Sequence, residues 1–110
     1  MASPYKIQWS HAAQKDLEAA MEYVAMDSPA TALKLFHSIR LKASSLKNYP
    51  ARGRHLPEFA HLRGMPFREL VMTPWRLIYR IRKTTVEVLA FFDGRRDLEE
   101  ILYERLSRFS

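Results

Sequence analysis

Several features are missing from this chain of 110 residues, and each absence narrows what the protein can do. It contains no cysteine, which excludes disulfide bonds and thiol chemistry and is consistent with a reducing compartment. No apolar run approaches the roughly 18 residues that a membrane span needs. The first residues, MASPYKIQWSH, also lack the apolar core of a signal peptide. We therefore expect one domain over residues 1–110, located in the cytoplasm.

Signals for common catalytic and cofactor sites are also absent. The four histidines, His11, His37, His55 and His61, do not have the spacing of metal ligands, and no cysteine is present to complete a site. The chain has neither the glycine-rich loops that bind nucleotide phosphates nor the G-x-S-x-G turn of serine hydrolases. We therefore expect no metal and no cofactor.

The positive charge of the chain is concentrated in one segment. The net charge is +6, and residues 52–83 contain eight basic residues against two acidic ones, whereas the rest of the chain contains ten of each. Seven of the eight are arginines, whose planar guanidinium group can bind phosphate or carboxylate through two hydrogen bonds. This segment favours an acidic partner, either a nucleic acid or an acidic protein segment. The alternative is the solvated face of a basic protein.

The first half of the sequence predicts a strand and two helices. Residues 5–9 alternate between apolar and polar side chains, which is the period of a strand with one buried face. Ser10 can cap a first helix, and Ser28 followed by Pro29 can cap a second one after a short break. Apolar residues recur at three- and four-residue steps in both helices, so they should pack as an antiparallel hairpin. Together with a helix at the end of the chain, this hairpin could also leave an apolar groove for a partner helix.

The second half predicts three strands and a final helix. The runs Phe67–Met72, Trp75–Arg82 and Val86–Phe92 are rich in β-branched, aromatic and apolar residues, and the segments between them are short enough for hairpins. The third run is apolar on both faces, so it should be a central strand covered on both sides. Asp97 can cap the last helix. Residues 50–66 should form an ordered connector.

The predicted element order is therefore β-α-α-β-β-β-α, which is an α+β fold. We expect a mostly antiparallel sheet with the helical hairpin packed on one face and a C-terminal helix. The first strand should lie at an edge of the sheet or beside the last strand.

Arginines recur along the predicted strands and in the turn that follows the last one. Arg76, Arg80 and Arg82 share one side of their strand because side chains alternate, and Tyr79 on the opposite side should belong to the core. Arg68 lies on the neighbouring strand and could line one basic surface with them. The predicted target-binding surface consists of Arg52, Arg54, Arg68, Arg76, Arg80, Arg82, Arg95 and Arg96. The alternative is that these arginines pair with the nearby carboxylates and hold the connector and the turn together, the carboxylates being those of Glu58, Glu69, Asp93 and Asp97.

Six short motifs occur in a fixed order along nearly the whole chain. They are Ala13-Gln14-Lys15-Asp16-Leu17, Asp27-Ser28-Pro29, Pro50-Ala51-Arg52-Gly53-Arg54-His55-Leu56-Pro57-Glu58, Arg68-Glu69-Leu70, Trp75-Arg76-Leu77-Ile78-Tyr79-Arg80-Ile81 and Asp93-Gly94-Arg95-Arg96-Asp97. Their order and spacing resemble the RelE/ParE superfamily of toxins of type II toxin–antitoxin systems, and most closely its ParE branch of plasmid stabilisation proteins. The resemblance implies a cognate antitoxin that binds the toxin in a hetero-oligomer. We expect an acidic, partly disordered antitoxin segment to fold against the basic sheet edge and the hairpin.

The resemblance implies two possible mechanisms. ParE-like members bind and poison DNA gyrase, whereas RelE-like members cut messenger RNA on the ribosome. For cutting, the resemblance implies that Arg68 and Arg95 hold the phosphate, with His55 or Glu58 as acid or base. Many nuclease members have histidine where this chain has Asp93, and an ordinary aspartate has no proton to donate near neutral pH. We therefore expect a gyrase-binding toxin that is not an enzyme, with ribosome-dependent RNA cleavage and a non-toxic nucleic-acid-binding module as alternatives.

Overall fold

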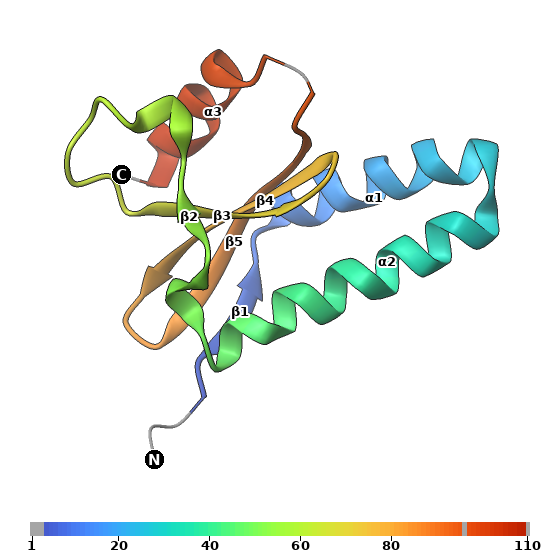
Figure 1. Ribbon diagram of the computed structural model, residues 1–110, viewed down its shortest axis with the longest axis horizontal. Helices are drawn as coiled ribbons and strands as arrows, with labels where there is room; N and C mark the ends of the chain where they lie inside the picture. The colour runs from blue at the N-terminus through green and yellow to red at the C-terminus, as the bar shows by residue number, and fades with distance from the viewer. Residues whose placement is uncertain (1–3, 96, 110) are drawn as a thin grey trace.

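A computed structural model describes residues 4–95 and 97–109, and it has an α+β fold built on one five-stranded sheet (Figure 1). In chain order the elements are β1 (Lys6–Trp9), α1 (His11–Asp27), α2 (Pro29–Ser44), β2 (Arg54–His55), β3 (Phe67–Met72), β4 (Trp75–Arg82), β5 (Thr85–Asp93) and α3 (Glu99–Leu106). The predicted order is confirmed with one addition, because the two-residue strand β2 lies within the connector between α2 and β3. Within the described residues, no helix combines the length and hydropathy needed to cross a bilayer.

The two predicted serine caps form, one at the start of each helix of the hairpin. The Ser10 Oγ accepts a hydrogen bond from the Ala13 N–H at 3.0 Å, and the Ser28 Oγ accepts one from the Thr31 N–H at 3.2 Å. Pro29 lies in the first turn of α2, where its missing N–H would have had no partner within the helix. The short break lets α1 and α2 pack together, and Figure 1 shows the hairpin projecting beyond the sheet.

The sheet has the strand order β1-β5-β4-β3-β2. β1 runs parallel to β5, and every other neighbouring pair is antiparallel. β1 therefore lies both at an edge and beside the last strand, as predicted. A register shift places Ile78 opposite Ala90 and Tyr79 opposite Val88, so Leu89 is an extra residue in β5. Because of this bulge, Leu89 and Ala90 both contribute to the core on the α3 side of the sheet.

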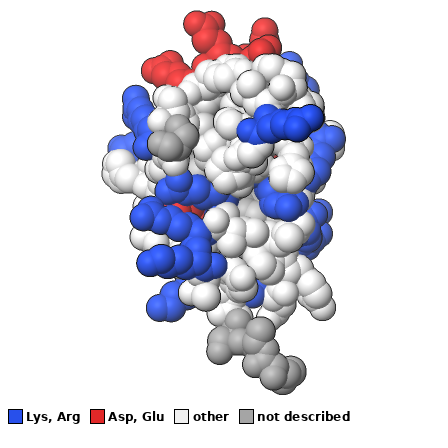
Figure 2. Space-filling model, turned by 90° about the vertical axis from the view of Figure 1, so that its left-hand side faces the viewer, with Lys and Arg blue, Asp and Glu red and all other residues white. Residues whose placement is uncertain are grey.

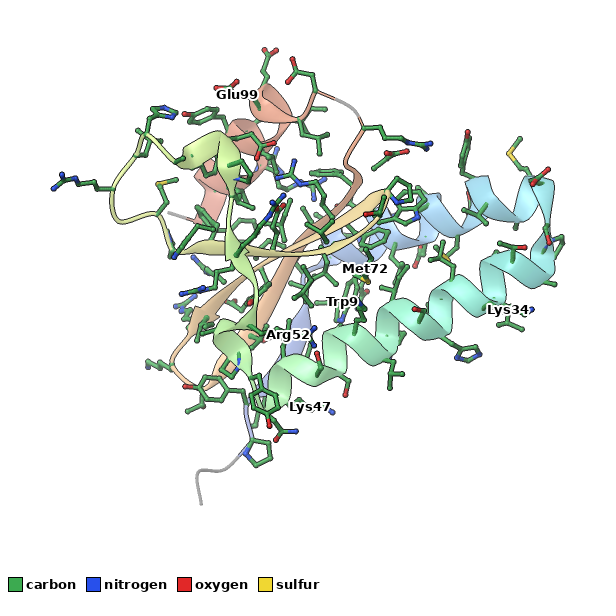
Figure 3. The ribbon with its side chains drawn as sticks, in the orientation of Figure 1. Trp9, Lys34, Lys47, Arg52, Met72 and Glu99 are labelled. Atoms are coloured by element: carbon green, nitrogen blue, oxygen red, sulfur yellow. The ribbon has the colours of Figure 1, made fainter. Side chains whose placement is uncertain are left out.

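Each face of the sheet has its own apolar core. On one face the hairpin packs against the strands around buried residues such as Leu46 and Leu77, and Trp9 and Met72 lie between sheet and hairpin (Figure 3). On the other face the leucines of the C-terminal segment, which include Leu102, pack against the connector and the strands. β5 contributes to both cores, which confirms the prediction of a central strand covered on both sides.

The connector is held to the sheet by the hydroxyl group of a buried tyrosine. The Tyr79 hydroxyl accepts a hydrogen bond from the Gly53 N–H at 2.9 Å and donates one to the Pro50 carbonyl at 2.7 Å. A Cβ atom at position 53 would lie 2.5 Å from the Tyr79 Oη and 2.7 Å from the Glu69 carbonyl oxygen, so only glycine fits. Burial raises the pKa of Tyr79, which keeps its hydroxyl protonated as a donor. The prediction that Tyr79 belongs to the core is confirmed.

The last helix begins later than predicted. α3 starts at Glu99, and the residue before it, Leu98, makes no side-chain cap. Asp97 does not occupy the cap position. Its Oδ1 accepts a weak hydrogen bond from the Glu99 N–H at 3.3 Å, which closes a local turn one residue earlier. The prediction of Asp97 as the helix cap is therefore wrong by one position.

Candidate functional site

Four charged residues form one chain of ion pairs on the α3 side of the sheet. The Nη1 and Nη2 atoms of Arg76 bind the two carboxylate oxygens of Glu58 at 2.6 and 2.7 Å. The Arg76 Nε binds one oxygen of Glu69 at 2.6 Å, and the other Glu69 oxygen binds the Arg54 Nε at 2.6 Å. We call Arg54, Glu69, Arg76 and Glu58 the ionic chain. Since it contains two cations and two anions, it carries no net charge.

The ionic chain joins the connector to strands β2, β3 and β4. The Glu69 side chain is fully buried and that of Arg76 is 9% exposed. Hydrogen bonds from Arg76 lower the pKa of Glu58 although partial burial opposes them, and hydrogen bonding to Glu58 in turn raises the pKa of Arg76. Gly94 makes room for this arrangement, because a Cβ atom there would lie 2.8 Å from the Arg76 Cδ. All three nitrogens of the Arg76 guanidinium group thus bind carboxylates of the protein itself, which links β4 to β3 and to the connector.

The other arginines of β4 differ in their exposure. As predicted, they lie on the same side of the strand as Arg76. The Arg80 Nε binds Glu87 at 2.8 Å, its Nη1 donates to the Phe109 carbonyl, and its guanidinium group lies 5.3 Å from the centre of the Phe109 ring. Its side chain is 13% exposed. Arg82, at the end of β4, is exposed. Only the outermost arginine of the strand is therefore well exposed to solvent.

Arg68 lies on the opposite face of the sheet from Arg76. It is directly across from Tyr79, whose side chain belongs to the hairpin core, and opposed residues of antiparallel strands share a face. Its Nη1 donates to the carbonyls of Ala51 at 3.2 Å and Gly53 at 2.8 Å. The prediction that Arg68 and Arg76 line one basic surface is therefore wrong, because strand alternation separates them.

The turn after β5 presents Arg95 to solvent. The Gly94 N–H donates to the Pro74 carbonyl at 2.6 Å, which holds this turn against the β3–β4 hairpin. The Arg95 side chain is 70% exposed, and its Nη2 lies 2.6 Å from an oxygen of Asp93. This hydrogen bond raises the pKa of Arg95. Arg96, which was predicted to belong to the same surface, lies outside the described residues.

Several exposed cations gather where α2 ends and the connector begins. A groove of about 370 Å³ is lined there by Lys42, Arg52 and Arg54, among other residues. The Arg52 Nη1 binds the Ser45 Oγ at 2.6 Å, and Figure 3 shows Arg52 and Lys47 near the end of the helix. Lys42 was not among the predicted site residues, because the apolar stripe of α2 indicates only a helix that packs against the core. The basic spacing from Lys42 through Lys47 to Arg52 was the signal that could have shown it.

The exposed charges are unevenly distributed over the molecule. Figure 2 shows acidic side chains at one end, which is the end where Figure 3 places Glu99 of α3. Basic side chains are spread over the middle and lower part of the same face. Uncharged surface lies between them, so a partner that approaches this face meets separate basic side chains, with acidic ones concentrated at the α3 end.

An apolar groove of about 620 Å³ lies along the helical hairpin. Leu17 and Met21 of α1 and Phe36 of α2 contribute apolar lining, whereas Glu22 and Arg40 add charge of opposite sign. The predicted groove involved the last helix as well as the hairpin, whereas α3 contributes no residue to the lining of this groove. Exposed apolar residues of the same hairpin, Tyr23, Met26, Leu33 and Leu41, add to its apolar surface. A surface of this kind suits a protein partner.

The four residues predicted for RNA cleavage divide between different parts of the fold. His55 of β2 is directly across from Arg68 of β3, so these two share the hairpin face. Glu58 is bound by Arg76 on the other face, and Arg95 is paired with Asp93 in the turn after β5. Among residues 4–95 and 97–109, no group of three or more His, Cys, Asp or Glu side chains is arranged to hold a metal ion.

Known proteins resemble this chain in sequence. The family profile of the ParE toxin of type II toxin–antitoxin systems matches residues 7–98. Toxin RelE2 of Caulobacter vibrioides is 33% identical over 69 residues, which are 63% of this chain and 70% of that protein.

Solved structures show the same fold. A chain of the chromosomal ParDE system from P. aeruginosa superposes with a TM-score of 0.67 at 21% identity, covering 84% of this chain and 98% of that one. A mutant of E. coli toxin RelE in the free state gives 0.63 at 17% identity, covering 97% and 99%. The toxin–antitoxin complex RelBE2 from Mycobacterium tuberculosis gives 0.58 at 21% identity, covering 84% and 94%.

Proposed function

The chain belongs to the ParE toxin family of type II toxin–antitoxin systems, and from this premise we propose that it inhibits growth by binding and poisoning DNA gyrase. A cognate antitoxin neutralises it by forming a hetero-oligomer with it. In this proposal the toxin acts through binding and carries out no chemical step.

The observation that carries the proposal is that the acidic groups near the arginines are already engaged. RNA cleavage needs one group to take a proton from the attacking 2′-hydroxyl and another to protonate the leaving oxygen. Both oxygens of Glu58 are bound by Arg76, and its lowered pKa keeps it ionised at neutral pH. Asp93 accepts hydrogen bonds from Arg95. Neither carboxyl group is therefore available as a proton donor.

The exposed surfaces are those that a protein target would use. The hairpin groove is largely apolar and is lined by Arg40 among other residues, whereas the exposed arginines of the connector line a separate groove at the end of α2. We assign contact with the target to Arg52, Arg54, Arg82 and Arg95. Arg96 stays in the proposal on sequence grounds alone. Arg76 and Arg80 have structural roles instead: Arg76 binds the connector, and Arg80 binds the C-terminal segment.

Ribosome-dependent RNA cleavage is the second candidate, and one observation favours it. His55 and Arg68 are cross-strand neighbours on one face, which places an imidazole beside a guanidinium group. The similarity to toxin RelE2 points in the same direction. A plain nucleic-acid-binding module is supported only by the exposed arginines.

Purified toxin separates these candidates in three parallel assays. We expect it to inhibit the supercoiling of relaxed plasmid by gyrase and to trap gyrase on cleaved DNA. We expect messenger RNA on translating ribosomes to stay intact, and naked RNA or DNA to bind only weakly at physiological salt. Unchanged supercoiling at saturating toxin would refute the gyrase proposal. Codon-specific cuts on ribosomes would establish the second candidate in its place.

A further inference from the structure

The outer edge of β5 is only partly covered by a neighbouring strand. β1 pairs with β5 from Thr85 to Val88, and the Ser10 N–H then donates to the Val88 carbonyl. β5 continues to Asp93, so its second half has no strand on that side within the described part of the chain. Backbone groups at such an edge need other partners, because an unpaired buried N–H or carbonyl group is costly and an open edge can pair with another chain.

Two side chains from opposite layers supply those partners. The Phe91 N–H donates to Asp16 Oδ2 at 3.0 Å, and the Leu89 carbonyl accepts from Arg105 Nη1 at 3.1 Å. Asp16 and Arg105 also bind each other, with distances of 2.7 Å for Nη1 to Oδ2 and 3.1 Å for Nη2 to Oδ1. The Arg105 guanidinium group lies 5.0 Å from the centre of the Phe92 ring. The pair therefore offers β5 one acceptor and one donor, as a neighbouring strand would.

The same pair ties the two helical layers together. Asp16 is on α1, between Ala13 and Leu17, which are buried in the hairpin core. Arg105 is on α3, next to Leu106, which is buried in the core on the other face. The two charged side chains are 13% and 19% exposed, so water screens them much less than a surface ion pair. Of the ion pairs formed by described residues, this one joins α1 to α3.

We propose that Asp16 and Arg105 replace a strand at the open edge of β5 and thereby fix α3 on the sheet. We call this pair the β5 clasp. Asp16 is a positioning residue, because it binds Arg105 and thereby sets the place of α3. The inference does not depend on gyrase as the target, since it concerns the toxin alone.

The β5 clasp differs from an ordinary ion pair in one testable respect. Reversing the charges would restore an ordinary pair. It would not restore the clasp, because an arginine at position 16 cannot accept the Phe91 N–H and an aspartate at position 105 cannot donate to the Leu89 carbonyl. The swapped variant, Asp16→Arg with Arg105→Asp, therefore distinguishes the two explanations.

Amide hydrogen exchange measured residue by residue on the purified toxin tests the proposal. In Asp16→Ala, we expect the Phe91 amide to exchange about tenfold faster or more, with faster exchange in α3 as well. In Arg105→Met, the α3 amides should exchange faster while the Phe91 amide stays protected by Asp16. Asp16→Asn keeps a carbonyl oxygen for the Phe91 N–H, so it should also protect this amide and loosen α3.

Matched controls come from neighbouring exposed positions on the same helices. Lys15→Gln on α1 and Glu104→Gln on α3 should leave both sets of amides as in the unmodified protein. The swapped variant should exchange as fast as Asp16→Ala at Phe91. If the swap restores protection at Phe91 and in α3, the pair is an ordinary ion pair and the proposal is wrong. Unchanged α3 exchange in both Asp16→Asn and Arg105→Met overturns it equally.

Discussion

The two faces of the sheet are stabilised by different means. The hairpin face has an apolar core in which the Tyr79 hydroxyl is the buried polar anchor for the connector. The α3 face combines an apolar cluster with the ionic chain, in which Glu69 is fully buried between Arg54 and Arg76. The difference shows that the arginine-rich segment serves two purposes. Its buried members stabilise the fold, and only its exposed members are available to a partner.

Breaking the ionic chain should have the largest effect on stability. Arg76→Met keeps most of the volume but leaves Glu58 without its partner and the buried Glu69 with only Arg54. We expect a loss of about 3–5 kcal/mol in the free energy of unfolding, measured by urea denaturation. Arg82→Met, on the same side of β4 but exposed, is the control. A loss for Arg76→Met as small as that for Arg82→Met would mean that the ionic chain does not stabilise this face.

Removing the polar anchor of the hairpin face should cost less. Tyr79→Phe deletes the hydroxyl and leaves the buried Gly53 N–H without its acceptor, for an expected loss of about 1–3 kcal/mol. The connector should also be held less firmly, so a protease should cleave the chain faster between residues 50 and 66. Tyr49→Phe removes a hydroxyl from an exposed tyrosine in the same region and should change neither quantity. Equal behaviour of the two variants would contradict the anchoring role.

Acid should weaken the α3 face before the hairpin face. The pKa of Glu58 is below its ordinary value of 4.5 in the folded protein, chiefly because Arg76 donates to it. Its pairing therefore contributes stability above the unfolded-state pKa, and the contribution is lost as pH falls through the lower folded-state pKa. The stability difference between unmodified toxin and Glu58→Gln should shrink as the pH is lowered from neutral to about 3. Glu100→Gln on α3 is a suitable control, and a difference independent of pH would argue against the pairing.

The exposed arginines should matter least for stability and most for the partner. Arg52→Gln and Arg82→Gln should each change the free energy of unfolding by no more than about 0.5 kcal/mol. Under the gyrase proposal they should weaken target binding, and the loss should be smaller at high salt. The affinity of each variant for gyrase, measured at two salt concentrations, checks this, with Lys15→Gln as control. If both variants bind the target as tightly as the unmodified toxin, these arginines do not contact it, and the hairpin groove becomes the expected contact surface.

Much of the fold could be predicted because its signals are local. The Ser10 and Ser28 caps lie next to the periodic segments they begin, and each hairpin turn is only a few residues long. β2 had no such local signal. Its position depends on the hydrogen bond from the Gly53 N–H to the Tyr79 hydroxyl, and these residues are 26 positions apart. A strand of two residues is also too short to show a period.

The charged site was harder to predict than the fold. Alternation along β4 correctly grouped Arg76 with Arg80, because that step uses one strand only. Placing Arg68 required the register between β3 and β4, which the sequence does not display. Arg76 binds Glu69 on the neighbouring strand and also Glu58, which lies 18 positions away in a turn of the connector. Exposure of each arginine therefore depended on contacts that only the folded chain brings together.

The parallel pairing of β1 with β5 has a consequence for when the fold can form during synthesis. Lys6 aligns with Thr85, so β1 cannot pair with its neighbouring strand until β5, which is synthesised much later, has left the ribosome. Contacts between such distant parts of a chain close slowly, since a long loop has to be ordered first. A nascent chain interrupted before β5 would lack the strand on which both cores rest. The five-stranded sheet can therefore form only after β5 has been synthesised.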